Sequence, residues 1–214
     1  TMNRGGVAWG TWGTALALAL VSLLAPAAAE TVAQLNGASS VVETQPTHDF
    51  SSGVLSCTVW AYPERKSGEE ALASFAQSDL LKSATLGWSA GKFYYRDDHS
   101  GVVETNKTYD RKEWHHAAMV ATVEDLGVYS DASGTQPAHR RVKIYVDGEE
   151  QIDLVTVMPD LSTAVFTVGS EHRGGQRRAH FKGSVDEARA YASELSAAQV
   201  AELPFEKPPR GSKI

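Results

Sequence analysis

The first residues that suggest chemistry form the pentapeptide GWSAG at positions 87–91, which matches the Gly-x-Ser-x-Gly pattern of serine hydrolases. In those enzymes the nucleophilic serine lies on a sharp turn between a strand and a helix. Here the next residues, 92–96 (KFYYR), have the composition of a strand. We therefore expect Ser89, Ala90 and Gly91 to form a hairpin turn, which argues against a serine hydrolase.

Aromatic residues offer a better lead to a ligand. A sugar can stack its C–H faces on flat rings while neighbouring polar groups bind its hydroxyls. Trp88 and Tyr94 are our first candidates for such a platform, with Trp60 and Tyr62 as further candidates. The alternative is that these rings pack in the core, because alternation along a strand does not say which face meets water.

A turn of polar residues follows at 97–101 (DDHSG). Its side chains can bind a sugar hydroxyl or calcium, so Asp98 and His99 join the predicted ligand-binding residues, with a solvated turn as the alternative. His115 and His116 are weaker metal candidates, because adjacent residues of a strand point to opposite faces. We expect these two histidines to be structural.

The charge balance and the N-terminal residues indicate where the protein acts. The chain has 26 acidic and 20 basic residues and a net charge of −6, which argues against nucleic acid as the main partner. Residues 1–29 have the plan of a secretory signal peptide, with Arg4 before an apolar run at 15–24 and small residues at 27–29. That run is shorter than the roughly 20 residues that cross a bilayer. We therefore expect export to the extracellular space or the cell surface, without a membrane span.

Short alternating runs predict one all-β domain over residues 30–205, followed by a flexible tail at 206–214. Cys57 is the only cysteine, so no internal disulfide can form, and its place in an alternating run predicts a buried, unreactive thiol. The predicted strands are 31–35, 41–43, 54–62, 92–96, 113–122, 141–146, 152–157, 164–168 and 181–191.

Two local signals are specific. Asp147 and Gly148 have the residue types of a primed two-residue turn, so the runs on either side should pair as a hairpin. Ser196 and Gln199 match a capping box at the start of a short helix. Pro204 should end that helix.

The order of these segments resembles the laminin-G-like, concanavalin A-like jelly rolls. Residues 181–191 (FKGSVDEARAY) look like the closing strand of that family, and residues 35–43 (LNGASSVVE) look like its opening hairpin. Residues 114–118 and 142–149 fit between them in the family's order, so the resemblance covers almost the whole chain after the leader. It implies a two-sheet antiparallel β-sandwich with a short C-terminal helix, in a family that mostly recognises extracellular glycans or proteins.

The resemblance also implies a structural Ca²⁺ ion. Asp186 matches a carboxylate that ligates calcium in related jelly rolls. Because calcium takes about six to eight oxygen ligands, backbone carbonyls and Asn36 or Asp49 are candidates for the rest of the site. The alternative is a hydrogen-bonded aspartate at the end of a strand.

Glycoside hydrolases of the same shape are the enzymatic alternative. They need two carboxylates that face the scissile bond. The related glucanases carry them in a Glu-x-Asp-x-x-Glu run, whereas this chain has no Glu-x-Asp at all. Acids on separate strands, such as Asp98, Glu104 and Glu113, leave the alternative open.

These patterns predict a secreted, noncatalytic module that recognises extracellular carbohydrate or a glycosylated protein surface. A structural subunit of a cell-surface assembly is the main alternative, because the edge strands of a small sandwich can pair between copies. A jelly-roll glycoside hydrolase is the third.

Overall fold

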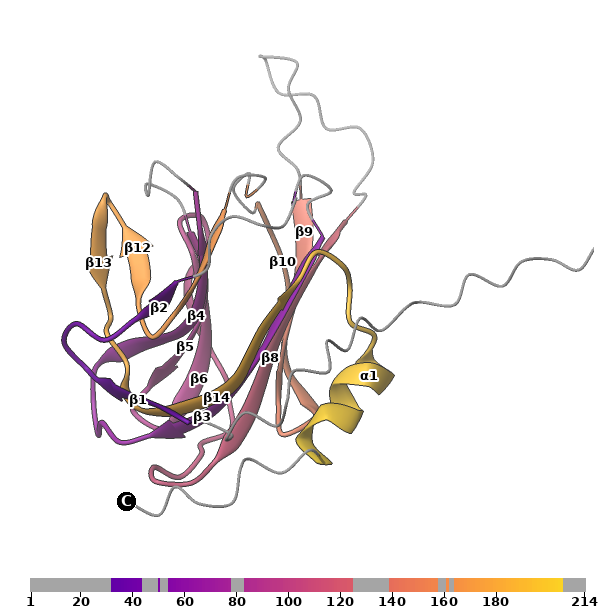
Figure 1. Ribbon diagram of the computed structural model, residues 1–214. Helices are drawn as coiled ribbons and strands as arrows, with labels where there is room; N and C mark the ends of the chain where they lie inside the picture. The colour runs from indigo at the N-terminus through magenta and orange to yellow at the C-terminus, as the bar shows by residue number, and fades with distance from the viewer. Residues whose placement is uncertain are drawn as a thin grey trace, which may run out of the picture. The chain divides into compact units, whose positions relative to one another are not determined.

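The computed structural model describes residues 32–43, 50, 54–77, 83–124, 139–157, 161 and 164–205. The predicted leader and tail lie outside these residues. The described residues form two antiparallel sheets of six strands each, called sheet A and sheet B below (Figure 1). The predicted fold class, a two-sheet antiparallel β-sandwich with a short C-terminal helix, is confirmed.

The element bounds are as follows. Sheet A contains, in spatial order, β1 (Ala33–Asn36), β14 (Lys182–Tyr191), β3 (Leu55–Pro63), β8 (His115–Val123), β9 (His139–Val146) and β10 (Glu149–Val157). Sheet B contains β2 (Val42–Glu43), β11 (Val165–Val168), β4 (Glu69–Ala76), β5 (Ser83–Ser89), β6 (Lys92–Asp97) and β7 (Gly101–Glu104). A separate hairpin joins β12 (Glu171–Arg173) to β13 (Gln176–Arg178), and α1 (Ala197–Glu202) is followed by a short 3₁₀ turn (Leu203–Phe205).

Each sheet turns one face into a shared core. On β8, Ala117 and Met119 belong to this core, whereas Ala118 lies on the outer face. Phe75 and Leu86 of sheet B are part of the same buried cluster. Burying a large apolar side chain in this way contributes about 1.5–3 kcal/mol, so the alternation of the strands holds the two sheets together.

Two hairpin turns that the sequence predicts are present in the structure. Asp147 and Gly148 both have positive φ, 51° and 82°, and connect β9 to β10 as predicted. Ala90 and Gly91 have φ of 49° and 92° and connect β5 to β6. The GWSAG pentapeptide therefore lies on a hairpin with no helix after it, and the serine hydrolase pattern has the wrong structural context.

The opening segment differs from its prediction. β1 pairs with β14 in sheet A, whereas β2 pairs with β11 in sheet B. Residues 35–43 therefore cross between the sheets, and the prediction that they form a hairpin is wrong. Asn36 starts the crossing, because its side-chain Oδ1 accepts hydrogen bonds from three successive backbone N–H groups, those of Ala38, Ser39 and Ser40.

The C-terminal helix has the predicted cap. The Ser196 side chain accepts a bond from the Gln199 N–H, and the Gln199 side chain accepts one from the Ser196 N–H. Val200 is the buried residue of the helix and packs with Ala118 on the outer face of sheet A. Within the described ranges, no helix has the length and apolar character needed to span a membrane.

Buried polar groups occur at both faces of β8. The Cys57 thiol is fully buried beside this strand, which confirms the predicted burial, and burial raises its pKa to about 12. His115 and His116 point to opposite faces, as expected. His115 contacts Phe93 in the core, whereas His116 packs edge-on against Trp60 on the outer face.

His115 links two turns. Its Nδ1 lies 3.0 Å from Asp147 Oδ2, and its Nε2 lies 3.0 Å from the Asp110 carbonyl oxygen. Burial lowers the pKa of His115, but the bonds to Asp147 and Asp110 outweigh burial and raise the pKa above its ordinary value. Since both partners accept hydrogen bonds, the imidazolium with two N–H donors fits this position best.

We expect His115 to make folding pH-dependent. A raised histidine pKa stabilises the fold fully below the unfolded-state pKa of about 6.5, and this stability is lost as the pH rises through the higher folded-state pKa. Urea unfolding of the wild type should therefore show a steeper fall in stability above about pH 6.5 than that of His115→Asn. His116→Asn is the control: the pKa of His116 is lowered to about 4 by burial, so it stays neutral through this window. An identical slope in wild type and His115→Asn would contradict the prediction.

Glu70 joins the two sheets at one end of the core. Its Oε1 accepts the Lys182 N–H of β14 at 2.9 Å and lies 3.1 Å from Arg65 Nε. The side chain is fully buried, and its Oε2 has no hydrogen-bond partner among the residues that the structure describes. Burial raises the pKa of Glu70 to about 7, although the Lys182 N–H and Arg65 oppose the shift.

The raised carboxyl pKa has a predictable effect on stability. Between about pH 4.5 and pH 7 the folded state binds more protons at Glu70 than the unfolded state, so stability should fall as the pH rises. The full effect is about 3 kcal/mol, from 1.36 kcal/mol per pKa unit. Glu70→Gln keeps an acceptor for the Lys182 N–H and should flatten the profile in urea unfolding from pH 4 to pH 8. Glu104→Gln, at an exposed ion pair with Lys92, should leave the profile unchanged.

Candidate functional site

The two rings predicted to bind a sugar are both buried. Trp88 points into the core between the sheets, where its ring lies 5.2 Å from that of Phe93. Tyr94 lies on the other face of sheet B, with its hydroxyl donating to the Glu70 carbonyl oxygen at 3.2 Å. Both side chains have an exposed fraction of 0%, so neither can stack on a sugar, and the predicted platform is wrong. Core packing, the alternative, describes both positions.

Asp98 and His99 are exposed in the turn between β6 and β7. The Asp98 carboxylate accepts the Ser83 N–H at 3.3 Å, and the His99 N–H donates to Asp97 Oδ1 at 2.8 Å. These bonds are those of a solvated turn. The structure does not bring the turn together with Trp88, whose ring is on the inner face of the sheet.

Two of the predicted calcium ligands, Asn36 and Asp186, lie apart. Asp49 lies outside the described residues. The β1–β14 register pairs Asn36 with Lys182, which places Asn36 four positions, or about 13 Å, from the level of Asp186. The Asn36 side-chain oxygen already accepts three backbone N–H groups. Asn36 and Asp186 therefore do not meet at one ion.

No other group of three or more His, Cys, Asp or Glu side chains in the described part of the chain is arranged to hold a metal. Calcium binding itself stays a prediction from the resemblance.

A different set of side chains forms a surface that a sugar can reach. Trp114, Tyr62, Ser184 and Gln34 follow one another across the outer face of sheet A, and we call them the aromatic row. The ladders pair Tyr62 with Ser184 and Ser184 with Gln34. On the other side of Tyr62, the Trp114 ring lies 5.6 Å away at an interplanar angle of 53°. Directly paired residues share a face, so the four side chains lie side by side.

Exposure distinguishes these rings from the others. Among aromatic side chains whose burial the structure describes, only Tyr62, Trp114 and Tyr191 are not buried. Trp60 was a candidate with Tyr62, but it is only 7% exposed and packs on His116. The wider sequence proposal was therefore half right, because Tyr62 reaches solvent and Trp60 does not.

Hydrogen-bonding groups continue the aromatic row. The Ser184 hydroxyl donates to Gln34 Oε1 at 2.6 Å, and Gln34 Nε2 donates to Glu64 Oε1 at 3.4 Å. Arg111 Nη1 donates to the Glu64 carbonyl oxygen at 3.1 Å, which ties the loop before β8 to the end of β3. The row thus places two partly exposed rings next to a hydroxyl, a carboxamide and a carboxylate.

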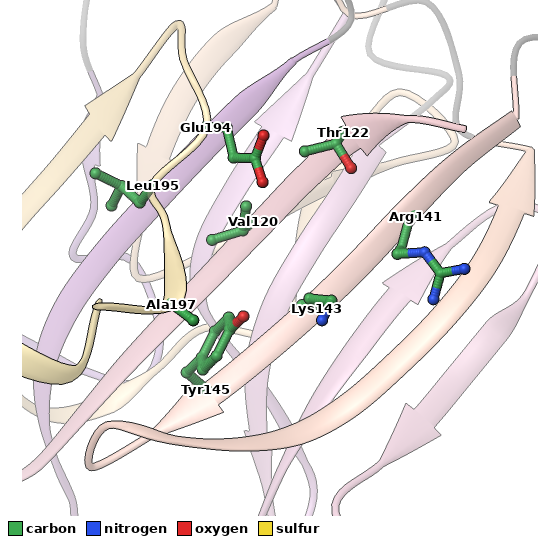
Figure 2. A pocket seen from close by; sticks show the side chains of 8 residues that line it. All are labelled: Val120, Thr122, Arg141, Lys143, Tyr145, Glu194, Leu195 and Ala197. Atoms are coloured by element: carbon green, nitrogen blue, oxygen red, sulfur yellow. The ribbon is translucent and has the colours of Figure 1, made fainter. Parts of the chain in front are cut away.

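A pocket of about 160 Å³ lies elsewhere on the outer face of sheet A, beside α1, and we call it the helix-side pocket (Figure 2). Its floor comes from two adjacent strands, and one wall comes from the segment that leads from β14 into α1. The lining residues are Val120 and Thr122 of β8, Arg141, Lys143 and Tyr145 of β9, and Glu194, Leu195 and Ala197 of the wall.

The two cations of this pocket are already paired. Arg141 binds the Glu124 carboxylate through Nε and Nη2, both at 3.1 Å, and binds Asp153 through Nη1 at 2.9 and 3.0 Å. Lys143 lies 2.7 Å from Glu150 and 3.5 Å from Asp153. These acids neutralise the charge that an anionic ligand would need.

Comparison with known proteins identifies the family. The laminin-G model of the concanavalin A-like lectin/glucanases superfamily matches residues 36–201, so the chain belongs to this superfamily. No curated protein sequence matches the chain significantly.

Solved structures share the fold at low sequence identity. A heptameric SAP-like pentraxin from Limulus polyphemus is similar with a TM-score of 0.59 at 15% identity, over 85% of each chain. Domain 4 of AbnA, an extracellular GH43 arabinanase from Geobacillus stearothermophilus solved with arabinotriose, has a TM-score of 0.52 at 20% identity, over 81% of this chain and 87% of that one. The CBM40 of the Ruminococcus gnavus IT-sialidase, bound to α2,3-sialyllactose, has a TM-score of 0.52 at 12% identity, over 71% and 82%.

Proposed function

We propose that this chain is an exported, noncatalytic module that binds extracellular carbohydrate, free or on a glycosylated surface, through the aromatic row. The observation that carries the proposal is the pair of partly exposed rings, Tyr62 and Trp114, on a sheet face beside Ser184 and Gln34. Flat rings take the C–H face of a sugar, and adjacent polar groups fix its hydroxyls.

The comparisons support a carbohydrate ligand. Two similar structures, the arabinanase domain and the sialidase CBM40, are solved with arabinotriose and sialyllactose respectively. The signal-peptide pattern at 1–29 supports export, where such ligands occur. Glu64 is the carboxylate hydrogen-bonded to the aromatic row, whereas glycoside hydrolysis needs two carboxylates across a bond, which favours a noncatalytic role.

Self-assembly is the second candidate, and two exposed side chains favour it. Val102 lies on β7 and Val155 lies on β10, and each of these strands is at one edge of its sheet, B and A respectively. Val102 is 40% exposed and Val155 is 39% exposed. Apolar residues on unpaired edges can support pairing between copies.

The aromatic row is tested by removing its rings. The protein lacking residues 1–29 is screened on a glycan array, with and without calcium, and the affinity for the best glycan is measured by calorimetry. We expect Tyr62→Ala and Trp114→Ala each to weaken binding about 10-fold, or about 1.4 kcal/mol, because each removes a stacking surface.

Tyr191→Ala is the matched control, because Tyr191 is the other partly exposed ring and pairs with Ser56, far along β3 from Tyr62. It should bind as the wild type does. Unchanged binding in Tyr62→Ala and Trp114→Ala would refute the aromatic row as the site. No glycan bound, together with stable polymers in light scattering, would favour self-assembly instead.

A further inference from the structure

Hydrogen bonds and buried packing hold the wall and the floor of the helix-side pocket in place. Its wall is anchored twice to β3, because the Ser56 hydroxyl donates to the Ser193 carbonyl oxygen at 2.8 Å and accepts the Leu195 N–H at 3.1 Å. Tyr145 and Val120 form the floor, and they pack with Val200 of the helix in a small buried cluster. The pocket therefore needs little rearrangement to receive a ligand.

Two polar groups of the pocket, the exposed Glu194 carboxylate and the partly exposed Thr122 hydroxyl, have no partner among the described residues. Figure 2 shows Glu194 extending from the wall over β8, on the same side of the strand as Thr122. Neither the Glu194 carboxylate nor the Thr122 hydroxyl makes a hydrogen bond or an ion pair with any residue that the structure describes. Arg141 and Lys143, by contrast, are held by Glu124, Asp153 and Glu150.

The net negative charge around the pocket favours a cationic ligand over an anionic one. Two cations face the three acids that pair with them, and Glu194 adds a fourth acid, so the local charge is −2. This excess of negative charge would repel an anionic sugar, and both cations of the pocket are already paired with acids. A protonated amine can instead donate to the Glu194 carboxylate in a charge-assisted hydrogen bond.

The remaining walls fit the body of a sugar. Val120 and Leu195 offer apolar surface to C–H groups, and Thr122 Oγ1 can donate to or accept from a ring hydroxyl. We propose that the helix-side pocket binds an amino sugar through its unacetylated, protonated amine, held by Glu194. This site is separate from the aromatic row and does not depend on the function proposed for the row.

The test compares two glycans that differ only at nitrogen. A glucosamine oligomer and its fully N-acetylated counterpart are titrated into the protein lacking residues 1–29 at pH 6, with binding followed by NMR. We expect the glucosamine oligomer to bind at least 10-fold more tightly, and this preference to shrink in high salt, which screens an exposed ion pair. A lysine-containing peptide is titrated in parallel.

Variants assign the effect to the pocket. Glu194→Gln should weaken binding of the glucosamine oligomer at least 5-fold, whereas Glu202→Gln, at an exposed position of α1 outside the pocket, should not. In Trp114→Ala, which removes a ring of the aromatic row, the preference for the glucosamine oligomer over its N-acetylated counterpart should persist, which separates this proposal from the aromatic row. Equal binding of the N-acetylated oligomer, no loss in Glu194→Gln, or binding of the lysine peptide but not of the amino sugar would each overturn the proposal.

Discussion

The register of β3 is the constraint on which both candidate sites depend. β3 lies between β14 and β8 in sheet A, and its inward residues Cys57 and Val59 are fully buried in the core. The same register sets Tyr62 beside Ser184 on the outer face and turns Ser56 toward the segment that walls the helix-side pocket. A slip of one residue would exchange the two faces of the strand, burying Tyr62 and exposing Val59. The core that stabilises the sandwich thus also positions the residues of both proposed sites.

Sheet B differs because its outer face is largely closed. Arg96 is buried there between the carboxylates of Glu171 and Glu69, with its guanidinium 5.4 Å from the centre of the Tyr94 ring. Glu171 belongs to the hairpin of β12 and β13, which lies beside sheet B in Figure 1. Burial of a charge is tolerated only when it is paired, so this network both covers the sheet and fixes the hairpin on it. The accessible rings are therefore on sheet A.

Much of the fold could be predicted from the sequence, because its signals are local. Alternation identified the long strands of sheet A, and the residue types at Asp147-Gly148 and Ser196 identified a turn and a helix cap that the structure contains. β4 was missed, since its sequence EEALASFA is rich in alanine and lacks β-branched residues. The sequence of β1 and β2 suggested a hairpin, but the choice between pairing locally and pairing with a distant strand depends on the whole sandwich.

The candidate sites were harder to predict because the sequence does not show which face of a strand is exposed to solvent. Alternation separates Tyr94 from its neighbours but does not say that a hairpin covers its side of the sheet. Trp114 lay within the predicted strand 113–122 and a family motif but was not a ligand candidate, because its contact with Tyr62, 52 residues away in the chain, depends on how the strands of sheet A pair. Asn36 and Asp186 were joined by analogy, and only the β1–β14 register shows how far apart they are.

The short helix is what divides the outer face of sheet A into separate sites. A six-residue helix is not stable alone in water, so α1 must draw its stability from its capping box and from Val200, which packs against the sheet. The Ser56 bonds hold the segment before the helix, and the far part of the helix lies close to the turn at Gly148, where an added Cβ would meet Ala201 at 3.5 Å, an ordinary contact distance. A helix held in this way cannot slide along the sheet without losing the wall that carries Glu194. The proposed helix-side pocket is therefore held by the same sheet that presents the aromatic row, and the two proposed sites share one support.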